Sequence, residues 1–249
     1  MRNVWTIAKR EYKLYFISPI AYIIALLLLL ITVIFFVLIV YIAGQQAFTQ
    51  GSATPPGTDS FINIIAYLFL LALPALTMRL MADEHRNGTL ELLLTYPLQD
   101  WELVVGKWLG AFLFILSIIA VTLIFPLALN KLVSPGIDQG LMLANYIGII
   151  LVAAAFLSIG TAISSFFNNQ FAAFFATLAV LFLLWWVVGW PAAVMPNGGG
   201  IFNYLSLSTH FYDSMLLGKV ALSDVIYYLS WTVFGLVMGT VAVEIRRWK

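Results

Sequence analysis

The stretch IAYIIALLLLLITVIFFVLIVYIA, from Ile20 to Ala43, carries no charge along its whole length. A helix needs about 20 apolar residues to cross the hydrocarbon core of a bilayer, where the backbone must satisfy its own hydrogen bonds. The stretch is too long for the apolar region of a signal peptide, and no small-residue cleavage site follows it. It therefore predicts a retained transmembrane helix.

The composition of the whole chain agrees with this prediction. The 249 residues are 63% hydrophobic and 9% charged, and the mean hydropathy is +1.01. Soluble domains carry about 25% charged residues, so the charges here are too few to cover a soluble globule. The net charge of +1 gives no reason to expect a nucleic-acid partner, and the absence of cysteine excludes disulfides and cysteine-ligated metals. We expect one membrane domain over residues 1–249.

Further apolar segments extend the pattern to six spans. Between Asp138 and Asp213 no Asp, Glu, Lys or Arg occurs, which leaves room for two spans around the polar turn at 168–170. Pro74 is expected to bend the second span. The chain is thus predicted to be an all-α polytopic membrane protein, with spans at residues 20–43, 61–78, 109–129, 146–166, 171–190 and 225–243.

The distribution of basic residues predicts the orientation. Cytoplasmic loops of membrane proteins are enriched in Lys and Arg. One side of the predicted topology holds ten of them, and the other holds only Lys131 and Lys219. Both termini are therefore expected in the cytoplasm, with the chain in the inner (plasma) membrane. The ten are Arg2, Lys9, Arg10, Lys13, Arg79, Arg86, Lys107, Arg246, Arg247 and Lys249.

Ahead of the first span, Val4 to Phe16 mixes apolar and basic residues. Such a mixture is typical of a helix that lies in the membrane interface. Ser18-Pro19 is expected to end it, because the residue before proline avoids helical geometry.

The connection between spans two and three is richer in charge than a simple loop requires. Thr89 can cap a short helix, and Glu91 in its first turn is favoured by the helix dipole. Leu90, Leu93 and Leu94 then share one face, and Pro97 limits the length. Asp100 is expected to cap the next helix, which continues into span three. The short helix either rests on the lipid interface or docks onto a cytoplasmic partner.

The outer segment from Pro191 to Asp224 is aromatic and uncharged over most of its length, yet lies outside the six spans. We expect short re-entrant helices here, which membranes tolerate where protein buries their ends. An aromatic belt at the interface is the other interpretation, and the two can both hold. His210 is expected to be an interface residue rather than a metal ligand.

Two Gly-x-x-x-Gly patterns, Gly106/Gly110 and Gly235/Gly239, could allow close approach of helices. Such patterns are common in membrane helices. Self-association through Gly235/Gly239 is one possibility, and packing within the chain is the other.

Several kinds of chemistry are missing from the sequence. No Gly-x-x-x-x-Gly-Lys-Ser/Thr loop for phosphate occurs, and His85 and His210 fall on opposite sides of the predicted topology. The six predicted spans contain no Asp, Glu, Lys, Arg or His, whereas ion-coupled transporters keep such groups at depth. We expect no catalytic, cofactor or metal site in this chain, and a secondary transporter or an intramembrane enzyme is disfavoured.

Several stretches together resemble type-2 ABC transporter permeases, most closely the branch of the gliding-motility permease, with the copper-site maturation permease of nitrous oxide reductase nearby. The resemblance covers essentially the whole chain in order. It is carried by Glu84–Pro97, Gly106-Lys107, Lys9-Arg10-Glu11 before Ser18-Pro19, Pro74–Arg79 and Leu205–Phe211.

The resemblance implies a six-span permease that pairs with a second permease chain, identical or related, and with cytoplasmic ABC ATPase subunits that bind ATP and Mg. In that family the N-terminal helix and the loop after span two contact the ATPase, and substrate moves outward. Carried over by position, the residues implied in ATPase coupling are Glu84, Arg86, Gly88, Thr89 and Glu91. The alternative function is a membrane scaffold subunit that transports nothing.

Overall fold

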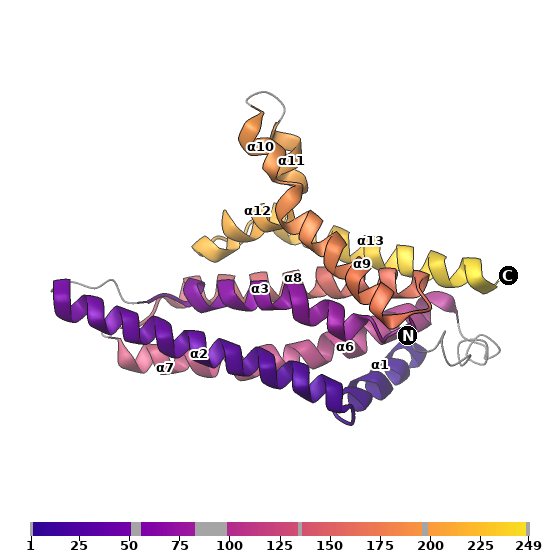
Figure 1. The fold of residues 1–249 in the computed structure, drawn as a ribbon, viewed down its shortest axis with the longest axis horizontal. Coiled ribbons are helices and arrows are strands. Elements are labelled where there is room, and N and C mark those ends of the chain that lie inside the picture. Colours follow the sequence, from indigo (N-terminus) through magenta and orange to yellow (C-terminus); the bar gives the residue numbers. More distant parts are fainter. Residues whose placement is uncertain (1, 51–55, 83–98, 134–135, 196–198, 248–249) are drawn as a thin grey trace.

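The computed structural model describes residues 2–50, 56–82, 99–133, 136–195 and 199–247. Long helices run side by side along one axis, and the N- and C-termini lie at the same end (Figure 1). We call this the terminal end. Within these ranges, six helical stretches are long and apolar enough to cross a membrane, and no β-strand occurs.

Each of the six helices matches one predicted span, so the predicted fold class is confirmed. They are α2 (Pro19–Gln50), α3 (Thr58–Thr77), α6 (Asp100–Thr122) with its continuation to Leu132, α8 (Gln139–Phe166), α9 (Gln170–Phe182) with its continuation to Ala192, and α13 (Leu222–Arg247).

Two predicted spans cross breaks in helical geometry. The third, 109–129, crosses the change at Leu123 from α6 to α7 (Ile124–Leu132), and the fifth, 171–190, includes a π-helical turn, η1 (Leu183–Val187). Hydropathy measures composition rather than hydrogen-bond register, so it could not locate these breaks.

Helix α8 forms the centre of the bundle. It packs against α13, α3, α9 and α6, and 78% of the residues in its most apolar 18-residue stretch are buried. In α2, the most apolar helix, only 11% of the residues in the equivalent stretch are buried. Helix α2 packs mainly against α3, so most of its apolar surface faces outward.

The Gly235/Gly239 pair lies on the face of α13 that packs against α8. A Cβ atom at Gly235 would come within 2.7 Å of the carbonyl carbon of Ser158. A Cβ at Gly239 would lie 3.4 Å from the Cα of Ala162. The pair therefore serves close packing within the chain, and α8 covers the face that self-association would have used.

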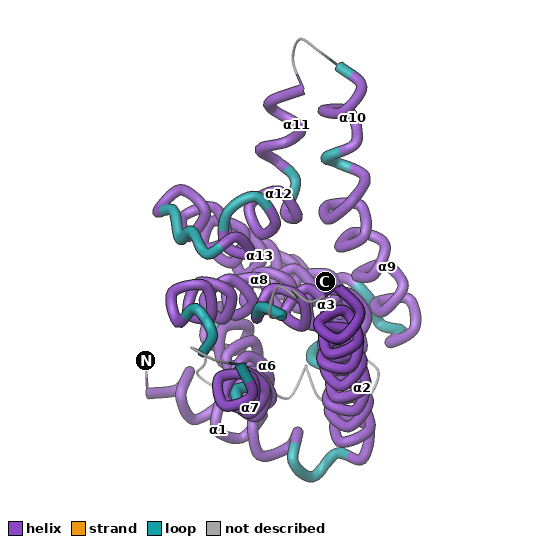
Figure 2. Tube along the Cα trace, turned by 90° about the vertical axis from the view of Figure 1, so that its left-hand side faces the viewer, coloured by secondary structure: helices purple, strands orange, loops and turns teal. Residues whose placement is uncertain are grey.

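The outer segment forms short helices, as predicted: α10 (Trp190–Val194), α11 (Gly199–Leu205), α12 (Leu207–Tyr212) and η2 (Met215–Leu217). Helices α10 and α11 stand off from the bundle as a pair in both views (Figures 1 and 2). They lie beside the length of the bundle rather than beyond its end, which favours the predicted re-entrant path.

His210 is buried, so its prediction as an interface residue is wrong. It is 8% exposed, and its Nδ1 lies 2.7 Å from Oδ1 of Asp224, which is 6% exposed. Its Nε2 lies 2.9 Å from the carbonyl oxygen of Tyr204, and its ring stacks on Tyr227 with centroids 3.9 Å apart. Asp224 lies in α13, which begins at Leu222, before the predicted boundary. The charge is tolerated because its partner comes from α12, a pairing that hydropathy does not reveal.

Candidate functional site at the terminal end

The five predicted coupling residues, Glu84, Arg86, Gly88, Thr89 and Glu91, lie outside the described residues, and so does His85. The segment that contains them, residues 83–98, is described at both of its attachment points. The geometry of these two attachments, and of the helices that hold them, defines the candidate site.

The first attachment is made by one hydroxyl group on α8. The backbone N–H groups of Met81 and Ala82 each donate to Oγ of Ser164 at 3.2 Å. The same hydroxyl donates to the carbonyl oxygen of Met78 at 3.2 Å. A hydroxyl has one proton to donate and two lone pairs, so Ser164 is fully used. The chain leaving α3 is thereby fixed to the central helix.

The second attachment is a capping box at the start of α6. The backbone N–H of Gln99 donates to Oε2 of Glu102 at 3.3 Å, and the Gln99 side chain accepts from the backbone in return. Asn3 donates to the same Oε2 at 3.0 Å. The prediction that Asp100 caps this helix is wrong, because Gln99 and Glu102 satisfy the free N–H groups reciprocally. Through Asn3, this attachment is tied to the N-terminal helix.

The N-terminal helix α1 (Arg2–Tyr15) lies along α6, and its existence confirms the predicted helix. Glycines on α6 allow the two backbones to approach closely. A Cβ atom at Gly106 would lie 2.8 Å from Cβ of Ile7, and one at Gly110 would lie 2.6 Å from Cβ of Glu11. Any larger residue at Gly110 would therefore displace α1.

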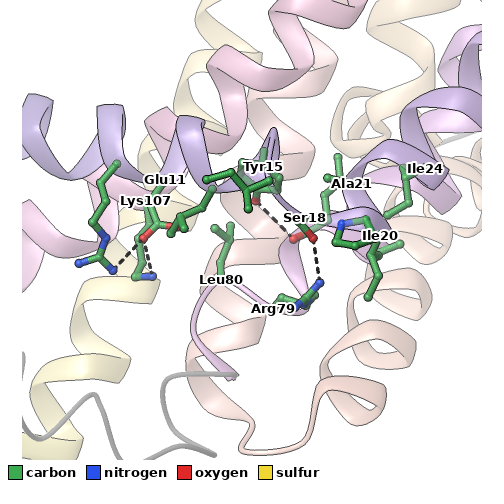
Figure 3. A pocket seen from close by; sticks show the side chains of 15 residues that line it. Glu11, Tyr15, Ser18, Ile20, Ala21, Ile24, Arg79, Leu80 and Lys107 are labelled. Atoms are coloured by element: carbon green, nitrogen blue, oxygen red, sulfur yellow. Dashed lines mark hydrogen bonds and ion pairs between the residues drawn. The ribbon is translucent and has the colours of Figure 1, made fainter.

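A buried ion pair joins the same two helices. Nζ of Lys107 lies 3.2 Å from Oε1 of Glu11, and their side chains are 3% and 9% exposed (Figure 3). Lys107 lies before residue 109, where the third span was predicted to begin, but inside the helix that was expected to lead into that span, and α6 (Asp100–Thr122) includes it. The lysine is accommodated inside the helix packing because the Glu11 carboxylate offsets its charge.

Two further polar contacts hold the corner between α1 and α2 against the end of α3. Nη1 of Arg79 donates to Oγ of Ser18 at 3.3 Å, and the Tyr15 hydroxyl donates to the carbonyl oxygen of Leu76 at 3.5 Å. Burial raises the pKa of Tyr15 far above its ordinary value, and the nearby Glu11 carboxylate raises it further. The hydroxyl therefore remains a donor at any physiological pH.

A small apolar cluster connects these parts to the C-terminal helix. It is separate from the main core and joins α6, α13 and the chain that follows α3, with a side chain of α1 packed against it. Its buried members are Met81, Leu103, Val104 and Val243, and Ile7 and Leu236 pack against them. This cluster and the hydrogen bonds of Ser164 therefore link α1, α6, α8 and α13 to the chain that leads into segment 83–98.

The described residues include no group of three or more His, Asp or Glu side chains placed to hold a metal ion. In the described part of the junction, hydrogen bonds, the buried Glu11–Lys107 ion pair and apolar packing join the helices, and such contacts can transmit force.

Comparison with known proteins identifies the family. The family described as "ABC-2 family transporter protein" matches residues 5–244. The chain belongs to this family. It is thus a multi-pass membrane permease, and the predicted type-2 ABC permease resemblance is confirmed at this level.

Two relatives of this ABC-2 permease are both named "Probable ABC transporter permease protein NosY". The one from Pseudomonas aeruginosa is 34% identical over 110 residues, 44% of this chain and 39% of its own. The one from Stutzerimonas stutzeri is 27% identical over 187 residues, 74% of this chain and 67% of its own. The chain thus matches about two fifths of the first relative's length and two thirds of the second's. The expected placement in the gliding-motility branch is not confirmed by these relatives.

The residues that hold the junction of this permease together were not predicted from the sequence. Glu11 belongs to the Lys9-Arg10-Glu11 stretch that carried the resemblance, and that stretch was the available signal. Its partner Lys107 lies 96 residues later. Ser164 gave no signal, because a serine in an apolar helix usually bonds its own backbone.

Proposed function

We propose that this ABC-2 permease is the membrane subunit of an ATP-driven exporter, in which a separate cytoplasmic ABC ATPase binds ATP and Mg and the permease moves substrate outward. The observation that carries the proposal is the double attachment of segment 83–98. The segment is fastened to α8 through Ser164 and to α1 through Glu102 and Asn3. A subunit docked on this segment and on α1 could move both sides of the bundle.

The coupling would run from the ATPase into the membrane helices by rigid contacts. Movement of α1 reaches α6 through the Glu11–Lys107 pair and the close packing at Gly110. Movement of segment 83–98 reaches α8 at Ser164. The charged residues of the segment, Glu84, Arg86 and Glu91, would orient the ATPase, and Gly88 and Thr89 would shape the start of the docking helix.

The charge distribution supports a cytoplasmic position for the terminal end. The described helices place Lys9, Arg10 and Lys13 on α1, at the terminal end, and Lys131 at the far end of α7. Because positive charge is retained on the cytoplasmic side of membrane proteins, this distribution supports our proposal that both termini are cytoplasmic in a chain of the inner membrane.

A second permease chain, identical or related, is part of the proposal. Large side chains of α2 remain exposed along one face, among them Leu26, Ile34, Val37 and Tyr41. Their exposed fractions are between 56% and 63%. This face of α2 is available for pairing with the second permease chain or for contact with the surrounding lipid.

Charge reversal in segment 83–98 tests the ATPase coupling. Glu84→Lys and Glu91→Lys leave every spanning helix untouched, so insertion should be normal. Removing one partner from a desolvated, hydrogen-bonded charge pair costs about 2–5 kcal/mol, so association with the ATPase should weaken by about 30-fold or more. The measurement is co-purification of the ATPase, together with ATP hydrolysis by the complex.

Lys131→Glu, an exposed charge reversal at the opposite end, is the matched control and should behave like the parent. If both Glu variants assemble and hydrolyse ATP as the parent does, segment 83–98 is an ordinary interfacial connector. If the variants assemble with an ATPase and its rate of ATP hydrolysis is the same for every substitution at the junction, the scaffold function is favoured instead.

A further inference from the structure

One side of the permease presents apolar surface that the rest of the chain leaves uncovered. Helix α3 packs against both α2 and α9, and Figure 2 shows α2, α9 and α10 along the same side of the molecule. We call the outward surface of these four helices the α2–α9 face. It carries large side chains that are between 58% and 79% exposed, among them Tyr41, Leu71, Phe175 and Val194.

An exposed aromatic cluster crosses this face at mid-span. Tyr67 lies halfway along α3 and is 41% exposed, and its ring stacks on that of Trp186 with centroids 5.8 Å apart. Trp186, in η1, is 39% exposed and contacts Phe182 of α9 at 4.7 Å between centroids. Tyr and Trp side chains that face lipid gather at the membrane–water interfaces, where their polar ends reach water. An exposed tyrosine at the centre of a span therefore indicates that protein, rather than lipid, covers it.

The pair of short helices α10 and α11 requires cover for a second reason. Helix α10 ends at Val194 and α11 begins at Gly199, both beside the length of the bundle (Figure 1). Helix ends leave backbone N–H and C=O groups without intrahelical partners, and hydrocarbon supplies none. Contact with water would instead expose Trp190, Val194 and Ile201, whose exposed fractions are between 70% and 79%. Another protein surface satisfies both requirements.

The surface that covers the face must itself be apolar and embedded in the membrane. The chain supplies one, because only 11% of the residues in the most apolar stretch of α2 are buried. Helices α2, α9 and α10 contain no Asp, Glu, Lys or Arg. A two-fold pair sets the same patch of each subunit against its copy, and an uncharged patch brings no like charges together.

We propose that a second copy of this chain covers the α2–α9 face through a two-fold axis, with α10 and α11 of each copy against the spans of the other. The proposal rests on the pairing of two permease chains given above, and it identifies the second chain and the surface that binds it. In this arrangement, Tyr67 and Trp186 lie within the interface rather than in lipid.

Photo-cross-linking of the full chain in its native membrane tests this proposal, with copies that carry two different tags. A reactive residue at Phe175 or at Val194 should capture the copy with the other tag. Val233, on α13, is 59% exposed, and α13 packs mainly against α8 and α6. The same reactive residue at Val233 is the control and should capture no second copy. The second tag is the readout, so the result does not depend on whether an ATPase docks at segment 83–98.

A pair of matched variants distinguishes an interface from lipid contact. Ala179 on α9 and Ala120 on α6 are both exposed, and lipid accommodates a larger apolar side chain at either position. A packed interface does not, because overpacking is destabilising. Ala179→Trp should therefore lower the capture of the second copy from Val194 by at least about 10-fold, whereas Ala120→Trp should leave it unchanged.

Three results would overturn the proposal. The first is capture of lipid alone, or of a different polypeptide in place of the second copy, from both Phe175 and Val194. The second is equal capture of the second copy from Val233, which would indicate random collision. The third is undiminished capture in Ala179→Trp.

Discussion

Replacing Lys107 by alanine is expected to detach α1 from α6. The change leaves the Glu11 carboxylate, which is 9% exposed, in the packed junction without its buried partner. Removing one member of a buried ion pair costs about 3–5 kcal/mol. The remaining neighbour, Arg10, has a side chain that is 56% exposed, and exposed pairs contribute at most about 1 kcal/mol.

Hydrogen–deuterium exchange of the α1 amides measures the effect. We expect exchange through opening of α1 to become more than about 100-fold faster in Lys107→Ala. Lys131→Ala, an exposed lysine on α7, is the control and should change nothing.

The double variant Glu11→Leu/Lys107→Met distinguishes loss of charge balance from loss of packing. Replacing a buried pair by apolar residues of similar volume is often neutral or stabilising, so protection of α1 should return. Unchanged exchange in Lys107→Ala, or a double variant as unprotected as the single one, would contradict the role given to the pair. If the proposed coupling is also correct, the double variant should hydrolyse ATP normally with its partner.

The second large effect is expected at the His210–Asp224 pair, which joins α12 to the start of α13. Both ring nitrogens of His210 face oxygens, Oδ1 of Asp224 and the carbonyl of Tyr204. Oδ2 of Asp224 is buried without a hydrogen-bond partner among the described residues. His210→Ala would leave a buried carboxylate with neither a counter-charge nor a donor.

We expect His210→Ala to release α12 from α13, because an uncompensated buried charge costs about 3–5 kcal/mol. The chain has no cysteine, and Ser206 is fully buried beside α12, so Ser206→Cys makes a nearly isosteric reporter. Maleimide labelling of this cysteine should become about 100-fold faster or more when His210→Ala is added.

Asp224→Asn is the matched variant, since its amide oxygen can still accept from His210 and no charge is left behind. Its labelling should rise much less. Slow labelling in the His210→Ala background would show that the pair does not hold the outer segment.

The arrangement of spans was predictable because a bilayer imposes a single strong requirement on composition. In a membrane protein, an uncharged run such as 20–43 indicates a span. The polar turn at 168–170 indicates a boundary between two spans, and the glycine-rich stretch after Pro191 indicates a break in the helix. The lengths of the helices were less predictable. Spans were ended at charges, and Lys107 and Asp224 then proved to lie inside helices because Glu11 and His210 offset them.

The candidate site was predictable only in part. Its position between spans two and three follows from local charge and capping signals, whereas its supports are pairings of residues far apart in the sequence. Asn3 meets Glu102, and Ser164 meets the backbone of Met81 and Ala82. Ser and Asn side chains usually form hydrogen bonds with backbone groups close to them in the sequence. No periodicity or motif therefore marks the cases in which they bond to a distant segment.

The central proposal is that an ABC ATPase docks on segment 83–98 and α1 and moves the bundle through them. Site-specific photo-cross-linking in the native membrane tests it most directly, with the reactive residue at Thr89, at Lys13 on α1 or at Leu132 on α7. Lys13 and Leu132 are both exposed, and the helices that carry them, α1 and α7, lie toward opposite ends of the bundle (Figure 1). We predict that Thr89 and Lys13 capture an ABC ATPase and that Leu132 captures none. Capture of the ATPase from Leu132, or of no ATPase from either Thr89 or Lys13, would contradict the proposal.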